Sequence, residues 1–286
     1  MERKGKKQRL ETRGQEVQAI APPKSRRYQQ MVWSLVWLAI AWLWAAPSWA
    51  GPLSDRLAAF PDWRSKPPTE AAVGDLGYPA WIAGDWDVTT TLVDLAAPLA
   101  PKITTPGFEG NRQQLGQPIT FRVRFGEAQA ARSPWPTRTP EPIIVADRAF
   151  NGLSLARAYL GDAARAVLVD PENPNRQITR LAGDRQLVSI VSRRATEAPD
   201  PDTFVTTEIF QQRFGTAGQL YFNEVETTTA YRHADPPGPD TPPIEADQVT
   251  AIYLSPQDPQ FFEAGDRPVA LYRYRLVFQP VGDRVP

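Results

Sequence analysis

The chain has 286 residues, with 32 Lys/Arg, 32 Asp/Glu, one histidine and no cysteine. The lack of cysteine excludes disulfides, thiol nucleophiles and iron–sulfur clusters, and a single histidine excludes a His-rich zinc site. We therefore expect no cofactor and no metal. Nine of the basic residues but only three of the acidic ones lie in residues 1–50, so the remainder is acidic and we expect no nucleic-acid partner.

Residues 1–50 are typical of a targeting segment. Met31–Ala46 is apolar except for one serine, two arginines precede it, and Pro47 and Ser48-Trp49-Ala50 follow it. A basic flank, an apolar core and small residues at −3 and −1 indicate a secretory signal peptide, cleaved after Ala50. The alternative is an uncleaved anchor, because about 20 apolar residues span a bilayer. In that case only this segment contacts the membrane.

The rest of the chain divides into an N-terminal lead, residues 51–80, and a strand-rich domain, residues 81–286. The lead is polar and weakly periodic, whereas the domain carries short alternating segments that are typical of strands. The expected strands are Trp81–Leu95, Ile119–Phe125, Ala166–Asp170, Gln177–Leu181, Gln186–Arg194, Phe204–Phe214, Gln219–Arg232, Gln248–Leu254 and Pro268–Phe278. One helix is expected at Asp147–Leu160, with Asp147 as its N-cap, and Gly183-Asp184 predicts a hairpin turn.

The order of these elements predicts the fold class. About nine strands in a row, mostly joined by hairpins, favour an antiparallel meander that closes on itself to remove its edges. The sequence therefore predicts an all-β fold, an antiparallel up-and-down barrel of about 8–10 strands with one short helix.

The start of the first strand carries a resemblance. Gly84-Asp85-Trp86, followed by the long loop Leu95–Pro118 and the meander, resembles lipocalins and the wider calycin superfamily. The resemblance implies a lipocalin-like barrel in which Trp86 closes one end and an arginine of the last strand, Arg273 or Arg275, packs over its indole. The early helix and a strand count above the lipocalin eight depart from that pattern.

A second resemblance covers most of the chain after residue 50. The segments Tyr78–Trp86, Ala97–Pro101, Thr105–Glu109 and Asp147–Gly152 are similar to an uncharacterised cyanobacterial and plastid protein family with no assigned activity. That resemblance implies the thylakoid lumen or the periplasm of a photosynthetic cell, which agrees with an export signal.

Two arginine pairs are the candidate ligand-binding residues. Arg122/Arg124 and Arg273/Arg275 each project to one face of a strand, because side chains alternate along it. A pair that faces the barrel interior forms a clamp for a carboxylate or phosphate head group. A pair that faces outward forms surface ion pairs instead. Tyr272 and Tyr274 alternate with the second pair and are further candidate ligand-binding residues, since they can pack on either side of the barrel wall.

Other polar residues give weaker indications. Glu208, Glu224 and Glu226 lie on expected strands, and the threonines beside Glu226 indicate that the last two face solvent on the outer surface. His233 precedes a proline-rich stretch and is expected in a loop.

These observations favour an exported, non-catalytic protein that binds an apolar or amphipathic small molecule, such as a lipid, pigment or quinone, inside the barrel. One alternative is an accessory or assembly factor for a photosynthetic membrane complex, motivated by the proline-rich loops and acidic composition. The other is a barrel-type isomerase or cyclase, which requires an inward-facing acid near the arginines. The fold by itself does not choose among them.

Overall fold

The computed structural model describes residues 51–128, 143–216, 219–234 and 242–282. The predicted signal or anchor segment, residues 1–50, lies outside them. In the part of the chain that the structure describes, no helix has the length and apolarity needed to cross a membrane.

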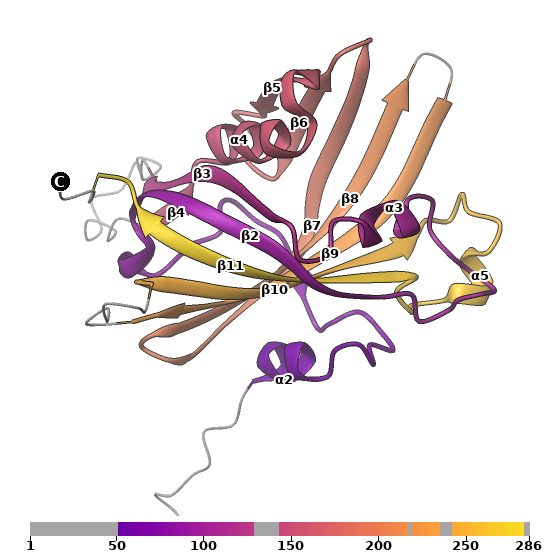
Figure 1. Cartoon of the computed structure of the whole chain (residues 1–286), viewed down its shortest axis with the longest axis horizontal. Coiled ribbons are helices and arrows are strands. Elements are labelled where there is room, and N and C mark those ends of the chain that lie inside the picture. The colour runs from indigo at the N-terminus through magenta and orange to yellow at the C-terminus, as the bar shows by residue number, and fades with distance from the viewer. Residues whose placement is uncertain (1–50, 129–142, 217–218, 235–241, 283–286) are drawn as a thin grey trace, which may run out of the picture. The chain divides into compact units, whose positions relative to one another are not determined.

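Antiparallel strands dominate the described residues and form one curled sheet (Figure 1). The strands are β1 (Glu70–Ala71), β2 (Gly84–Ala96), β3 (Pro118–Glu127), β4 (Ile144–Ala146), β5 (Ala164–Val169), β6 (Arg176–Leu181), β7 (Arg185–Asp200), β8 (Thr203–Thr216), β9 (Gln219–His233), β10 (Ile244–Leu254) and β11 (Ala270–Pro280). The helices are α2 (Pro52–Ala58), α3 (Phe108–Arg112), α4 (Arg148–Leu160) and α5 (Phe261–Ala264), with single 3-10 turns η1 (Ala80–Ile82) and η2 (Gly161–Ala163).

The strand order is that of an up-and-down meander, β4-β3-β2-β11-β10-β9-β8-β7-β6-β5, with the short β1 paired to β7. The first long strand pairs with the last, as in a barrel. The predicted fold class is confirmed, as are the nine expected strands and the helix at 147–160. The short strands β1 and β4 and the short helices α3 and α5 escaped prediction, because each has too few residues to show a period, and α2 was not predicted either.

Local chemistry explains the confirmed elements. In β3 the residues Ile119, Phe121, Val123 and Phe125 turn inward and are half-buried or buried, while the residues between them are exposed. Gly183 and Asp184 both have positive φ, at 72° and 52°, and they lie in a tight three-residue loop, since Leu181 pairs with Arg185. The Asp147 carboxylate accepts a hydrogen bond from the Phe150 amide at 3.0 Å and caps α4.

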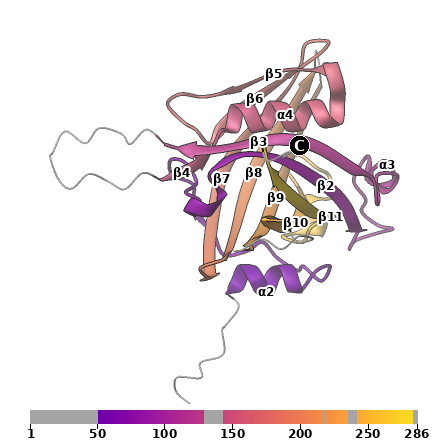
Figure 2. The same cartoon turned by 60° about the vertical axis from the view of Figure 1, so that its left-hand side comes forward.

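The sheet is a curled half-barrel rather than a closed one, and α4 lies between β3 and β5, near the two edges of the sheet (Figure 2). Side chains of α4 satisfy the exposed backbone of β3. The Asn151 side chain accepts from Arg124 N at 2.7 Å and donates to Arg124 O at 3.0 Å, and Ser154 Oγ accepts from Arg122 N at 3.0 Å. The helix therefore protects this edge without strand pairing.

One end of the half-barrel is filled by an apolar core. Trp86 and Val88 of β2 pack with inward residues of β3, β10 and β11, and with the fully buried Ile82 of η1. Trp86 Nε1 donates to Ile82 O at 2.8 Å. Tyr78 contacts Phe125 of β3 and Phe204 of β8, which are not neighbouring strands, so the curl brings opposite walls together here. Trp86 therefore lies inside the apolar core at this end of the half-barrel.

The outer face of the sheet is covered by α2 and the residues after it. Leu53, Leu57 and Trp63 are 1%, 4% and 4% exposed, and they pack on Val205, Val249, Ala251, Tyr253 and Leu271 of β8, β10 and β11. Figures 1 and 2 show α2 and α4 on opposite faces of the sheet. The lead, residues 51–80, is thus part of the folded domain.

Candidate functional site

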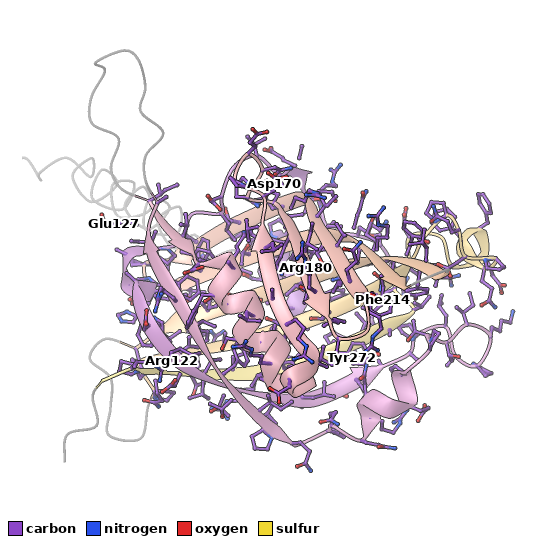
Figure 3. All side chains as sticks on the ribbon, turned by 90° about the horizontal axis from the view of Figure 1, so that it is seen from above. Arg122, Glu127, Asp170, Arg180, Phe214 and Tyr272 are labelled. Carbon is purple, nitrogen blue, oxygen red and sulfur yellow. The ribbon has the colours of Figure 1, made fainter. Side chains whose placement is uncertain are left out.

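A cavity of about 510 Å³ lies between α4 and the inner faces of β6, β7, β8 and β9. The helix contributes one face to it, namely Arg148, Gly152, Leu155, Ala156, Tyr159 and Leu160. The sheet contributes aliphatic and aromatic residues such as Leu187, Phe210 and Phe214. In Figure 3, α4 lies between the labelled Arg122 of β3 and Phe214 of β8. The volume is within the range of small-molecule sites in proteins.

The helix covers this cavity without filling it. In α4 no residue is fully buried, and Leu155, Tyr159 and Leu160, which line the cavity, are 42%, 45% and 50% exposed. A surface helix normally buries an apolar stripe against its sheet. The apolar face of α4 is therefore half-exposed over the cavity rather than buried against the sheet.

Gly152 explains how close the helix comes to the sheet at one point. A Cβ at this position would lie 2.9 Å from Gln177 Nε2 and 3.2 Å from Val167 Cγ1. A glycine in a helix interior costs about 1 kcal/mol relative to alanine. The close approach of β5 and β6 accounts for its presence here.

A buried ion cluster lies at the Arg148 end of the cavity. Arg148 Nη2 contacts Glu208 Oε1 at 2.7 Å, and Arg194 Nη2 contacts the same oxygen at 3.1 Å. The side chains of Arg148, Arg194 and Glu208 are only 16%, 11% and 13% exposed. Arg194 also donates to the side chain of Asn175, which lines the cavity. Two guanidinium groups thus share one carboxylate.

The pKa values of the two arginines reflect this sharing. Burial lowers the pKa of Arg148, but the charge and hydrogen bond of Glu208 outweigh it and leave the pKa above its usual value. Burial also lowers the pKa of Arg194, and the positive charge of Arg148 lowers it further. The opposing effect of Glu208 is smaller, so the pKa stays below its usual value. Two guanidinium groups thus contact Glu208, and Asp75 is the second, more distant acid, 4.0 Å from Arg148.

The predicted arginine pairs lie elsewhere, on the outer face of the sheet. Arg122 Nε contacts Asp87 Oδ1 at 2.9 Å and Arg124 Nε contacts Asp85 Oδ1 at 2.9 Å, each across neighbouring strands. These positions favour the surface ion-pair alternative over the inward clamp.

The second predicted pair behaves similarly. Arg273 Nη2 contacts Asp247 at 2.6 Å and Arg275 Nη2 contacts Glu245 at 2.7 Å. Both arginines line a groove of about 540 Å³ on the outer face beside α2, separate from the cavity under α4. Their carboxylate partners line the same groove, so the arginines there are already neutralised.

The expected contact of Arg273 or Arg275 with Trp86 is wrong. Trp86 faces inward, where its indole meets Phe278 edge-on at 6.3 Å, whereas the arginines face outward. Arg273 instead lies over the ring of Phe60, 5.5 Å from its centroid. Arg273 and Arg275 share the outer face because side chains alternate along β11, and the bulge beside Arg273 adds its extra residue, Val93, to β2 rather than to β11.

Tyr272 and Tyr274 do face inward, as candidates for the barrel wall. Tyr272 is buried against Phe108 of α3, so the long first loop closes over this region. Tyr274 lines a second cavity of about 440 Å³, which shares Tyr159 and Leu160 of α4 with the first.

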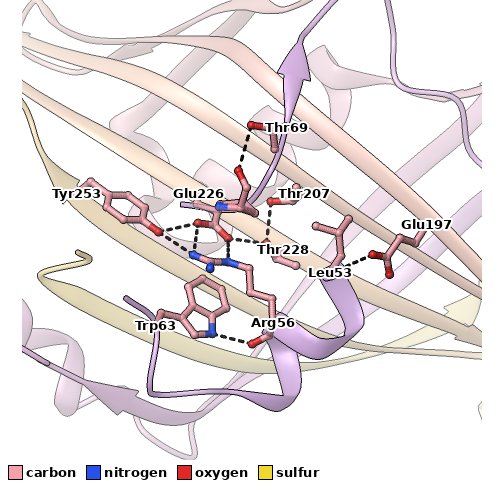
Figure 4. Close-up of polar contacts among 10 residues, drawn as sticks. Leu53, Arg56, Trp63, Thr69, Glu197, Thr207, Glu226, Thr228 and Tyr253 are labelled. Carbon is pink, nitrogen blue, oxygen red and sulfur yellow. Dashed lines mark hydrogen bonds and ion pairs between the residues drawn. The ribbon is translucent and has the colours of Figure 1, made fainter. Parts of the chain in front are cut away.

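A second buried polar cluster, on the outer face, was not expected (Figure 4). Glu226 is fully buried beneath α2, not solvent-exposed as predicted. Arg56 contacts its two carboxylate oxygens at 2.6 and 2.8 Å, and Tyr253 and Thr228 donate to it at 2.7 and 2.8 Å. Trp63 stacks on the Arg56 guanidinium at 3.8 Å. Every polar group has a partner, so the cluster fastens α2 to the sheet.

The remaining expectations concern single residues. Glu224 is partly exposed and contacts Lys66 at 2.6 Å. His233 is the last residue of β9 rather than a loop residue, and its ring stacks on Trp81 at 5.3 Å.

Together, the fold and the site define a curled antiparallel half-barrel with a helix-covered inner cavity. The chain belongs to the family described as Domain of unknown function (DUF6816), which it matches over residues 70–282. No curated protein and no solved structure gives a significant match to the chain.

Proposed function

We propose that the protein binds an apolar or amphipathic small molecule in the cavity under α4. The observation that carries this proposal is the half-exposed apolar face of α4, with Leu155, Tyr159 and Leu160 lining a cavity of about 510 Å³. A ligand in the cavity buries this face and adds hydrophobic stabilisation in proportion to the apolar area covered.

The contacts of Glu208, an acidic residue on the inner face, favour ligand binding over acid–base catalysis. Glu208 faces inward, but Arg148 and Arg194 hold it within 2.7 and 3.1 Å. Both guanidinium groups contact the same carboxylate oxygen, so Glu208 is held in an ion cluster rather than left free to contact a substrate. An isomerase or cyclase function is therefore the less supported alternative.

The test is native mass spectrometry and absorption spectroscopy on protein purified gently from its own source. We expect one small molecule per chain, lost in Ala156→Phe, where a ring from α4 enters the cavity. Arg157→Phe places the same ring on the exposed side of the same helix and is the matched control. A wild-type protein that is empty and takes up no apolar probe would contradict the proposal.

The proposal extends to the compartment. The signal-like residues 1–50 and the resemblance to cyanobacterial and plastid proteins support export to the thylakoid lumen or periplasm. N-terminal sequencing of the native protein tests this, with Gly51 as the expected first residue. A protein that still carries Met31–Ala46 in the membrane fraction would support the anchor instead.

The second candidate is an accessory factor for a membrane complex, and exposed apolar residues favour it. Phe262 of α5 is 92% exposed, and Leu220 and Tyr221 of β9 are 63% and 39% exposed. Such residues are common on partner surfaces, although isolated ones are also ordinary. Co-purification with a photosynthetic complex that is lost in Phe262→Ser, with no small molecule retained, would support this role over the first.

A further inference from the structure

We propose that the ligand of this cavity carries a single anionic head group, a carboxylate, which Arg148 binds at one end while the apolar body lies along α4. This inference rests on the proposed binding function and deepens it. It is carried by the position of Arg148, by its free donors and by the direction of the apolar face.

Among the described residues that line the cavity, Arg148 is the only charged one. Its guanidinium uses Nη2 to contact Glu208 Oε1 at 2.7 Å, while its Nε is 4.0 Å from the nearest Asp75 oxygen, which is too long for a hydrogen bond. A guanidinium has five N–H donors in a planar fork. The contacts to Glu208 and Asp75 therefore leave Arg148 able to form a paired contact with a second carboxylate.

The charge around Arg148 also suits an anion. Glu208 is shared between Arg148 and Arg194, so two positive charges face one buried negative charge. Asp75 is more exposed, at 33%, and compensates less because water screens it. The Nε of Arg194 is buried and has no hydrogen-bond partner among the described residues. A cationic ligand would meet Arg148 at close range and is disfavoured.

The apolar residues extend away from Arg148 in one direction. Arg148, Gly152, Leu155 and Tyr159 recur at helical spacing on the cavity face of α4, which ends at Leu160. With a rise of 1.5 Å per residue, this face is roughly 18 Å long. An elongated molecule with its charge at one end matches this arrangement better than a compact polar one.

The sheet wall opposite the middle of the helix is polar but uncharged. Gln177, Ser189 and Gln212 are aligned across β6, β7 and β8, on the inner face. They offer hydrogen bonds to a neutral group partway along the ligand, such as a hydroxyl or a carbonyl. No second charge is expected on the ligand body, because these side chains cannot neutralise one.

Competition between matched amphiphiles tests the inference. The probe is cis-parinaric acid, whose fluorescence rises on binding, and the competitors are laurate and dodecanol, which share a chain and differ in the head group. In wild type, we expect laurate to bind about tenfold to a hundredfold more tightly than dodecanol. This is the ratio of affinities that one hydrogen bond between charged groups contributes. Arg148→Gln abolishes this preference, whereas Arg275→Gln, on the outer face, retains it.

Each outcome separates the head-group inference from the proposed function. Equal binding of laurate and dodecanol in wild type, or a preference that survives Arg148→Gln, overturns the inference and leaves the binding function standing. Failure of the probe and both competitors to bind counts against the binding function itself.

A second variant keeps the test decisive if Arg148→Gln does not fold. Glu208→Gln removes the competing carboxylate and frees the donors of Arg148. We expect the preference for laurate to increase in this variant. A preference that stays unchanged or falls would overturn the inference.

Discussion

The two faces of the sheet are each covered by a helix, but in different ways. On the outer face, α2 is packed closely, with Leu53 and Leu57 at 1% and 4% exposure and a buried ion pair beneath it. On the inner face, α4 has no fully buried residue and lies over a cavity of about 510 Å³. Close packing is the ordinary state of a protein interior. From this contrast we infer that α2 stabilises the fold, whereas α4 covers the proposed binding site.

The largest expected effect is a loss of stability when the ion pair on the outer face is broken. Arg56→Ala leaves Glu226 fully buried without its cationic partner, and we expect unfolding free energy to fall by about 3–5 kcal/mol. Chemical denaturation measures this. The double variant Arg56→Met with Glu226→Leu removes the uncompensated charge and is expected to recover most of the loss. A single variant as stable as wild type would show that α2 does not hold the sheet.

A matched pair of leucines sharpens the comparison directly. Leu53→Ala in α2 removes a side chain that is 1% exposed, and we expect a loss of about 2–4 kcal/mol. Leu155→Ala in α4 removes one that is 42% exposed, and we expect a loss below about 1 kcal/mol in the ligand-free protein. Both are measured by denaturant unfolding. Equal losses would mean that α4 is packed like α2, which contradicts the proposed site.

The sequence predicted the strands better than it predicted their faces. Alternation in Ile119–Phe125 and the turn at Gly183-Asp184 are local features, and the structure confirms both. The sequence did not decide whether Arg273 and Arg275 face inward or outward, because apolar residues occupy both sides of β11. Only the pairing of β11 with β10 and β2 decides the question.

The two buried clusters lay beyond sequence reasoning because their partners are distant in the chain. Glu226 meets Arg56 from 170 residues away, and Arg148 meets Glu208 from 60 residues away. The threonines beside Glu226 correctly indicate the outer face, but not that α2 covers it. The spacing of Leu53 and Leu57 in the lead was the available signal, since an i, i+4 apolar pair predicts a helix with a face to bury.

Alkaline pH tests both faces, because each buries a tyrosine. On the inner face, burial and the nearby charge of Glu208 raise the pKa of Tyr231 to about 12, from about 10 in the unfolded chain. On the outer face, burial and Glu226 raise the pKa of Tyr253 above its usual value. The neutral forms are favoured by folding, so this stability is fully present below pH 10 and is lost as pH rises toward 12.

The measurement is denaturant unfolding between pH 8 and 12. For Tyr231, the loss is at most about 1.4 kcal/mol per pH unit above pH 10. Tyr231→Phe cannot ionise, so its stability should fall less steeply over this range. The same slope in wild type and variant would show that Tyr231 ionises as easily in the folded protein as in the unfolded chain.

The smallest expected effect concerns the arginines of the outer face. Replacing them tests whether they form only surface ion pairs or bind the ligand. Arg122 and Arg275 have side chains 46% and 62% exposed, and each contacts one carboxylate on a neighbouring strand. Exposed ion pairs of this kind add little to stability, because water screens the attraction and ordering two long side chains costs entropy. Arg122→Gln and Arg275→Gln should therefore leave both the unfolding midpoint and binding of the amphiphile probe unchanged. If either variant weakened binding as strongly as Arg148→Gln, the site would have to be moved from the inner cavity to the outer face.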